Sequence, residues 1–263
     1  MADEPRWALI LGASSGFGEA TALELARSGY DIIGVHLDRK TTMPHVEEVI
    51  GAVRAEGRAV VFFNVNAADP ERRVEVLARA REEAGAHGSV AVLLHSLAFG
   101  NLRPYIGAAA EESITPAQMD MTLSVMAHSL VYWTQDLVYS GLMRRGGKIF
   151  AMTSAGATRV LPNYGAVSAA KAALESHIRQ LAMELAPRGI AINGIRAGVT
   201  DTPALRKIPG NAAIVEGALR RNPSGRLTTT QDVARAIAVL CRPGTEWITG
   251  NVIGVDGGEE VVG

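Results

Sequence analysis

The chain has 263 residues, of which 48% are hydrophobic and 20% charged, with 26 basic against 27 acidic side chains. A chain of this length buries a sizeable core without disulfides or metals, and its formal net charge of −1 gives no reason to expect nucleic acid or a membrane surface as a partner. The single cysteine, Cys241, fits a reducing compartment. No apolar run approaches the roughly 18 residues of a membrane span, and none forms the core of a signal peptide. We therefore expect a globular, cytoplasmic protein.

Short apolar runs alternate with helix-length amphipathic segments along the chain. The runs carry apolar residues on both faces, which is typical of strands covered on both sides, and the longer segments repeat apolar residues at a spacing near 3.6. We expect strands at residues 7–11, 31–37, 59–65, 90–95, 148–152, 190–195 and 251–255. Asp69-Pro70 and Thr115-Pro116 are typical helix starts, and Gly29 is a typical helix end. The alternation predicts a single Rossmann-type α/β domain over residues 1–263, with about seven parallel strands in a doubly wound sheet and helices on both faces.

Residues 199–223 interrupt this alternation. The segment contains Pro203, Pro209 and Pro223 among short amphipathic pieces. Because it follows the sixth expected strand, it would lie at the carboxyl ends of the strands, where open α/β sheets bind ligands. We interpret the 199–223 segment as a substrate lid; an ordinary surface insertion is the alternative.

A glycine-rich stretch, Gly12-Ala13-Ser14-Ser15-Gly16-Phe17-Gly18, directly follows the first expected strand. Glycine lets the backbone turn sharply and approach a ligand, and the unpaired amides at the start of the next helix favour an anion such as a pyrophosphate. A purely structural turn is the alternative, but the position in the first strand–helix unit favours nucleotide binding. The residues expected to contact the nucleotide are Gly12, Ser14, Ser15, Gly16, Phe17 and Gly18.

Tyr164 and Lys171 open a segment that has the pattern of a long helix to about residue 185. Seven positions are two helical turns, so both side chains project from one face, ~10 Å apart along the axis. A lysine ammonium near a phenol stabilises the phenolate and lowers its pKa from ~10, which suits proton donation near neutral pH. We interpret the pair as catalytic; the alternative is a tyrosine at the edge of the core beside a solvated lysine.

Together these motifs resemble the short-chain dehydrogenase/reductase family over essentially the whole chain. The G-x-x-x-G-x-G spacing, Asn64-Val65 after the third expected strand and Asp256-Gly257-Gly258 near the end match that family. The resemblance implies that Asn64 and Val65 flank an adenine, that Thr202 contacts a nicotinamide carboxamide and that Lys171 holds the nicotinamide ribose. It also implies cofactor contacts in the turns after the fourth and sixth strands, at Ser96, Leu97, Ala98, Ala197, Gly198 and Val199.

The spacing Tyr-x6-Lys resembles one branch of that family, the divergent enoyl-acyl carrier protein reductases. Most family members have Tyr-x-x-x-Lys, and here Val167 occupies the position of their tyrosine. The stretch from His95 to Phe99 replaces the usual Asn-Asn-Ala-Gly, and Ala197-Gly198 replaces the usual Pro-Gly. Ser154 occupies the position of a second tyrosine in many enoyl reductases, where it either assists by hydrogen bonding or only marks the strand end.

This resemblance implies an NAD(P)H-dependent reductase of trans-2-enoyl thioesters carried by acyl carrier protein or coenzyme A. Hydride would enter at the β-carbon while Tyr164 stabilises the enolate oxygen. The alternative enzyme is a reductase of 3-oxoacyl thioesters or other carbonyls. The alternative from another class is a nucleotide-binding regulator without activity, against which the intact Tyr164 and Lys171 pair argues. The family resemblance also implies a homotetramer.

The residues after the second expected strand bear on the choice of cofactor. His36 occupies the usual position of an acid that binds the ribose hydroxyls of NAD, and Asp38, Arg39 and Lys40 follow. Arg39 and Lys40 could hold a 2′-phosphate, whereas Asp38 could bind a ribose diol, and Ser15 occupies the place where some NADP enzymes have arginine. The sequence favours NADPH over NADH.

Several remaining residues bear on a substrate pocket and on metal binding. We expect Phe99, Tyr105 and Leu205 to line the substrate site. Tyr105 lies on the loop after the fourth expected strand, and simple packing is the alternative for it. We expect His95 to form a structural hydrogen bond. The remaining histidines are scattered without the spacing of metal ligands, so no metal site is predicted.

Overall fold

A computed structural model describes residues 6–262, in which seven strands form one sheet with the order β3-β2-β1-β4-β5-β6-β7. All six neighbouring pairs are parallel. The strands are β1 (Arg6–Leu11), β2 (Asp31–His36), β3 (Val60–Asn64), β4 (Ser89–His95), β5 (Lys148–Thr153), β6 (Ala191–Ala197) and β7 (Val252–Val255). Each lies within two residues of its expected bounds, and the prediction of a Rossmann-type parallel sheet is confirmed.

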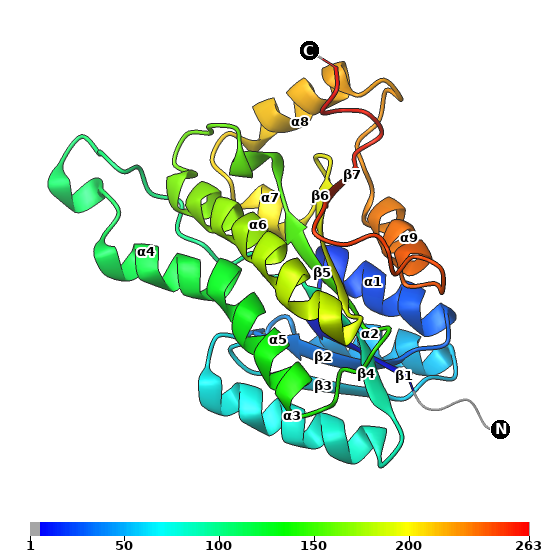
Figure 1. The fold of residues 1–263 in the computed structure, drawn as a ribbon. Coiled ribbons are helices and arrows are strands. Elements are labelled where there is room, and N and C mark those ends of the chain that lie inside the picture. Colours follow the sequence, from blue (N-terminus) through cyan, green and yellow to red (C-terminus); the bar gives the residue numbers. More distant parts are fainter. Residues whose placement is uncertain (1–5, 263) are drawn as a thin grey trace.

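Helices cover both faces of the sheet, as Figure 1 shows. They are α1 (Gly16–Arg27), α2 (Met43–Ala55), α3 (Pro70–Ala84), α4 (Pro116–Leu123), α5 (Ser129–Tyr139), α6 (Gly165–Leu185), α7 (Pro203–Arg206), α8 (Asn211–Arg221) and α9 (Thr230–Leu240). Alternate residues of β1 point to opposite faces: Leu9 packs with α3, α5 and α6, whereas Ile10 packs with α1 and α9. The sheet is therefore buried between two apolar layers.

The expected helix starts have the local chemistry that the sequence predicted. Asp69 Oδ1 accepts hydrogen bonds from the amides of Glu71 (2.9 Å) and Arg72 (3.2 Å) at the start of α3. Thr115 and Gln118 form a reciprocal capping box at the start of α4. Between α4 and α5 the chain forms a π-helical segment, Ser124–His128, so the two helices form one long bent unit along the sheet.

Because all seven strands run in the same direction, their carboxyl ends meet at one edge of the sheet. The glycine-rich loop follows β1, His36 ends β2, Asn64 ends β3 and His95 ends β4 at that edge. The 199–223 segment forms α7 and α8 after β6; its role as a lid stays a prediction. No helix within residues 6–262 has the length and apolar character needed to span a bilayer.

Candidate active site

The glycine-rich loop is built by close backbone approaches that exclude a side chain. Gly12 has a φ of 88°, and a Cβ there would lie 2.3 Å from the carbonyl oxygen of Ser96. A Cβ on Gly18 would lie 1.9 Å from the carbonyl oxygen of Gly12. Ser15 precedes α1 without a side-chain bond to the first-turn amides, so these N–H groups can bind an anion. The loop therefore fits the pyrophosphate of a dinucleotide.

The start of the 199–223 segment lies close to this loop. A Cβ on Gly16 would lie 3.6 Å from Cγ2 of Thr202. The Thr202 hydroxyl oxygen accepts a hydrogen bond from the amide of Leu205 at 3.2 Å and so caps α7. The structure thus brings together two of the predicted cofactor residues, one from each half of the chain. Phe17, by contrast, packs partly into the core beside α1 and α9.

A polar cluster surrounds the carboxylate of Asp38 just beyond the end of β2. Asp38 accepts hydrogen bonds from Nδ1 of His36 at 2.9 Å and from the hydroxyl of Thr42 at 2.7 Å. Burial opposes ionisation of this carboxyl, but hydrogen bonds from Ser14, Thr42 and His36 outweigh it and lower the pKa of Asp38. An ionised carboxylate therefore lies against Ser14 of the glycine-rich loop.

The other predicted residues at this end have different surroundings. Arg39 and Lys40 are exposed, and among residues 6–262 neither forms an ion pair with a carboxylate. Asn64 pairs with the backbone of Asp38: its Oδ1 accepts from the Asp38 amide at 2.9 Å, and its Nδ2 donates to the Asp38 carbonyl at 3.0 Å. Asn64 thus fixes the loop that presents Asp38, and its contact with adenine stays a prediction.

His95 is fully buried at the end of β4, directly before the predicted cofactor residues 96–98. The hydroxyl of Ser129 donates to the Val125 carbonyl at 2.7 Å, so it can only accept at 2.8 Å from Nε2 of His95. Burial, and then the charge of Lys171, lower the pKa of His95 to about 3. His95 is therefore a neutral structural residue, as predicted, and within residues 6–262 its Nδ1 has no hydrogen-bond partner.

Tyr164 is the residue directly before the first turn of α6, and it follows a strained position. Asn163 has a φ of 60° in the left-handed region. The phenol ring lies so close to Gly156 that a Cβ there would be 2.6 Å from Cε1 of Tyr164. Burial raises the pKa of the Tyr164 phenol, and a hydrogen bond from the Ser154 hydroxyl offsets part of that rise. The structure thus brings Tyr164 and Ser154 together at Gly156, and their catalytic roles stay predictions.

The prediction that Lys171 lowers the pKa of this phenol is wrong for the protein by itself. The side chain of Lys171 is only 5% exposed, and its Nζ donates to the carbonyl oxygen of Met152 at 2.6 Å. Burial lowers the pKa of Lys171 to about 8, while the charge of Glu175 opposes this shift. Desolvation, which disfavours the charged form of each group, is the main cause of both shifts, and Lys171 is not among the groups that shift the pKa of Tyr164.

Two acidic residues at the site were missed by the sequence analysis. Glu175 is one helical turn beyond Lys171 and accepts from the Thr153 hydroxyl at 2.7 Å; the i, i+4 spacing with Lys171 could have indicated it. Glu259 accepts from the amide of Val199 at 3.0 Å, although the two are 60 residues apart. No local signal in the sequence predicts the second contact.

The predicted substrate residues lie in three different settings. The ring of Tyr105 packs over the start of α6, where a Cβ on Gly165 would lie 2.6 Å from Cζ of Tyr105. Tyr105 is thus a neighbour of Tyr164. Phe99 is 57% exposed on the loop after β4, and Leu205 is partly buried on α7. The structure therefore shows that Tyr105 packs beside Tyr164, and the role of all three residues in substrate binding stays a prediction.

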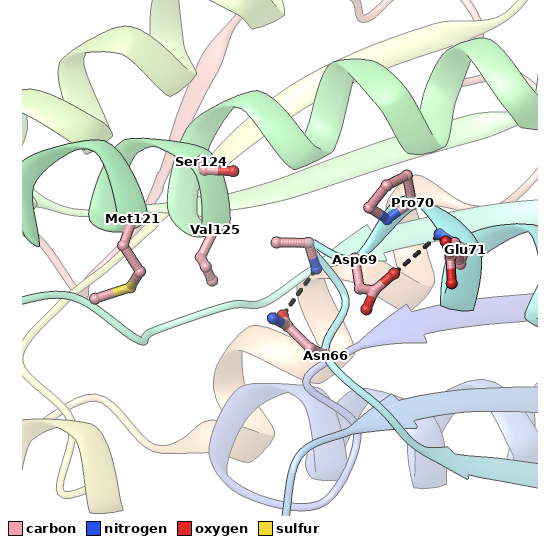
Figure 2. Close-up of a pocket in the computed structure, with 8 residues that line it drawn as sticks. Asn66, Asp69, Pro70, Glu71, Met121, Ser124 and Val125 are labelled. Atoms are coloured by element: carbon pink, nitrogen blue, oxygen red, sulfur yellow. Dashed lines mark hydrogen bonds between the residues drawn. The ribbon is translucent and has the colours of Figure 1, made fainter. Parts of the chain in front are cut away.

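A cavity of about 490 Å³ lies between the loop after β3 and the junction of α4 with the π-helical segment. In Figure 2, Met121 and Val125 project from the helix toward the loop that carries Asn66. The cavity is a continuation of the edge that carries Asn64, and it does not include Tyr164 or Lys171. Residues 6–262 contain no cluster of three or more histidine, cysteine or acidic side chains that could hold a metal ion.

Comparison with known proteins identifies the family of the chain. Residues 12–260 match the family described as enoyl-(acyl carrier protein) reductase. The chain belongs to this family of short-chain dehydrogenases/reductases. It is accordingly an oxidoreductase with a nucleotide-binding fold.

Individual relatives differ in what they reduce. The chain is 32% identical to 1-cyclohexenylcarbonyl-CoA reductase of Streptomyces collinus, over 99% of this chain and 89% of that protein. It is 29% identical to the 3-oxoacyl-[acyl-carrier-protein] reductase of Thermotoga maritima, over 97% of this chain and 98% of that one. The crystal structure of enoyl-[acyl-carrier-protein] reductase (NADH) from Aquifex aeolicus superposes with a TM-score of 0.85 at 27% identity, covering 99% of this chain and 98% of the other.

Proposed function

We propose that the protein reduces the carbon–carbon double bond of trans-2-enoyl thioesters. The observation that carries the proposal is the position of Tyr164 before the first turn of α6. Val167, at the position where most members of the wider family have their tyrosine, is 4% exposed and packs in the core. A phenol one turn earlier is displaced by roughly 4.5 Å along the helix axis. This displacement suits a hydrogen bond to a thioester oxygen while hydride is accepted further along the acyl chain.

A nicotinamide cofactor bound at the glycine-rich loop and Lys171 would supply the hydride for the β-carbon, and a proton from solvent at the α-carbon would complete the reduction. Tyr164 donates a hydrogen bond to the thioester oxygen and stabilises the negative charge that develops there. Because burial raises its pKa, the phenol keeps its proton at neutral pH and acts as a donor. Lys171 is held by the Met152 carbonyl and keeps N–H groups for the cofactor's ribose. Ser154 orients the phenol.

We infer that the cofactor is NADH, against the expectation from Arg39 and Lys40. The support is the ionised carboxylate of Asp38 beside Ser14 of the glycine-rich loop, where a ribose diol can donate to it and a 2′-phosphate would be repelled. Arg39 and Lys40 are exposed side chains of the same loop. The Aquifex aeolicus relative uses NADH.

The thioester carrier is proposed to be coenzyme A or acyl carrier protein. The Streptomyces collinus relative acts on a coenzyme A thioester and the Aquifex aeolicus relative on an acyl carrier protein. Both carriers present the same phosphopantetheine thioester, so the chemistry at Tyr164 is the same. The cytoplasmic location and the homotetramer stay predictions from the sequence.

The test is a spectrophotometric comparison of crotonyl-CoA with acetoacetyl-CoA, with NADH and then NADPH as the reductant. The expected result is oxidation of NADH that depends on crotonyl-CoA, with a kcat/KM at least about tenfold above that for acetoacetyl-CoA. Reduction of acetoacetyl-CoA alone would replace this proposal with that of a carbonyl reductase.

The carbonyl reductase is retained as the second candidate because of one observation. The hydroxyl of Ser154 hydrogen-bonds the Tyr164 phenol, and a hydroxyl pair of this kind also suits polarisation of a ketone oxygen. The similarity to the 3-oxoacyl reductase of Thermotoga maritima extends over nearly the whole chain. The same pair of assays separates the two reactions.

A further inference from the structure

One buried carboxylate contacts both ends of the 199–223 segment. Glu259, in the turn after β7, is 2% exposed. Its Oε2 accepts from the amide of Val199, at the start of the segment, at 3.0 Å. Its Oε1 accepts from Nη2 of Arg221, the last residue of α8, at 3.4 Å. In Figure 1 the red segment after β7 runs beside α8.

The turn that carries Glu259 is itself fixed by hydrogen bonds. Asp256 accepts from the amide of Gly258 at 3.0 Å through Oδ1, and from the amide of Glu259 at 3.2 Å through its carbonyl oxygen. The Asp256 carbonyl also accepts from Nδ2 of Asn222 at 2.9 Å. Asn222 and Gly257 also border a cavity of about 200 Å³, and the hydrogen bond from Asn222 joins the end of α8 to this turn.

The close approach of the Glu259 carboxylate also explains why residue 198, in the turn after β6, is a glycine. A Cβ on Gly198 would lie 2.9 Å from Oε2 of Glu259 and 2.3 Å from Oγ1 of Thr228. The amide of Gly198 in turn donates to the Val255 carbonyl at 3.1 Å. The turn after β6 and the chain end after β7 are thus built against each other, with Glu259 at their junction.

We propose that Glu259 is a positioning residue that fixes the two ends of the 199–223 segment and thereby places Thr202 and Leu205 over the cofactor and acyl chain. The segment begins at Val199, just after β6, and α8 ends at Arg221, and the same carboxylate contacts both points. The kinetic test of this inference rests on the proposed function, because it uses an enoyl thioester as substrate. The hydrogen-exchange test of the 199–223 segment does not depend on the proposed function.

The two contacts can be separated by substitution. In Glu259→Gln the side-chain carbonyl still accepts from the Val199 amide, but the NH2 group that faces Arg221 cannot accept. Arg221→Gln removes the same contact from the other side, and Glu259→Ala removes both contacts. Glu216→Gln is the matched control, because Glu216 pairs with Arg220 on the same helix in an exposed ion pair, where we expect changes within about twofold.

The first readout is hydrogen–deuterium exchange of peptides that cover residues 199–221. Glu259→Gln is expected to accelerate exchange in 211–221 only, and Glu259→Ala to accelerate it also in the amides that follow Gly198. Unchanged exchange in folded Glu259→Gln protein would overturn the proposal. If Glu259→Ala does not fold, Glu259→Gln and Arg221→Gln carry the test.

The second readout is steady-state kinetics. Glu259→Gln is expected to raise KM for crotonyl-CoA about tenfold with kcat within about twofold, since a charged hydrogen bond is lost away from the reacting atoms. The double variant with Arg221→Gln should be no worse than either single variant. A lowered Tm with unchanged KM, or additive effects, would overturn the proposal. If the wild type reduces acetoacetyl-CoA alone, or neither thioester, the proposed function fails, and hydrogen exchange still decides the role of Glu259.

Discussion

The ammonium group of Lys171 donates a 2.6 Å hydrogen bond to the carbonyl oxygen of Met152, inside a site where the lysine is 5% exposed. This contact ties α6 to the end of β5. It places the lysine at the carboxyl edge of the sheet, where burial lowers the pKa of Lys171 to about 8. The charge of Lys171 therefore changes within an accessible pH range.

Cofactor affinity should fall as the pH rises through about 8. Below that pH Lys171 is protonated and can donate to the ribose, and above it one donor hydrogen and the charge are lost. Fluorescence titration of NADH between pH 6.5 and 9.5 measures the effect, expected to be about tenfold in Kd. Lys171→Arg keeps its charge and should give a flat profile, so equal slopes in the two proteins would contradict the assignment.

The lowered pKa of Lys171 also makes the stability of the folded protein depend on pH. Stability rises with pH, whereas cofactor affinity is expected to fall. The folded-state pKa of Lys171 lies below its unfolded value of 10.5, so between about pH 8 and 10.5 the unfolded chain binds more protons. This group therefore makes the folded state more stable as pH rises through that window. Urea unfolding of the wild type and of Lys171→Met, which lacks the titration, separates this contribution from that of other groups.

Replacing Tyr164 by phenylalanine should remove the hydrogen bond to the thioester oxygen. We expect kcat for crotonyl-CoA to fall about 100-fold or more, as with loss of one oxyanion donor, while cofactor affinity stays within about twofold. Tyr139→Phe is the control, because Tyr139 is 78% exposed at the end of α5. Turnover by Tyr164→Phe at the wild-type rate would remove Tyr164 from the mechanism.

Replacing Asp38 by serine should change the cofactor preference. The substitution removes the carboxylate that lies against Ser14, so kcat/KM for NADH should fall about tenfold and that for NADPH should rise. The control is Asp120→Ser, an exposed residue of α4. A wild-type enzyme that prefers NADPH would contradict the inference from Asp38.

Gly12 and Gly29 have the same φ of 88°. Substituting each by alanine therefore distinguishes the cost of backbone strain from the cost of a steric clash. Gly29 has no atom within 4 Å of an added Cβ, so Gly29→Ala should cost only the conformational penalty of roughly 1–2 kcal/mol. Gly12→Ala adds a clash with the Ser96 carbonyl and should also lower NADH affinity at least about tenfold, because the phosphate-binding loop is displaced. Urea unfolding and NADH titration of both variants make the comparison. Equal effects would mean that the loop tolerates a side chain.

The sequence allowed the sheet and much of the site to be predicted because their signals are local. Strands covered on both faces are continuous apolar runs, so all seven were found near their true bounds. The glycine spacing after β1 and the Tyr164–Lys171 spacing identified the family. Asp69-Pro70 and Thr115-Pro116 identified helix starts through contacts within three residues.

The contacts that shift pKa values at the candidate site join residues far apart in the chain. The pKa of Tyr164 rises because the folded chain removes water from the phenol, which no spacing rule reveals. Asp38 hydrogen-bonds with Ser14 of a loop that precedes it by a helix and a strand, whereas its sequence neighbours, Arg39 and Lys40, favoured NADPH in the sequence analysis. These interactions are set by which strand ends meet at the carboxyl edge.

By itself the sequence determined the fold class and the family, and it predicted Tyr164 and Lys171 as a catalytic pair, because each of these depends on residue types at fixed short spacing. Only the tertiary structure decided the charge state of Lys171, the surroundings of Asp38 and the contact of Glu259 with Val199. Burial and long-range hydrogen bonds exist only once separate segments are packed together. Glu259 and Val199 are 60 residues apart, and it is the pairing of β6 with β7 that brings their segments side by side.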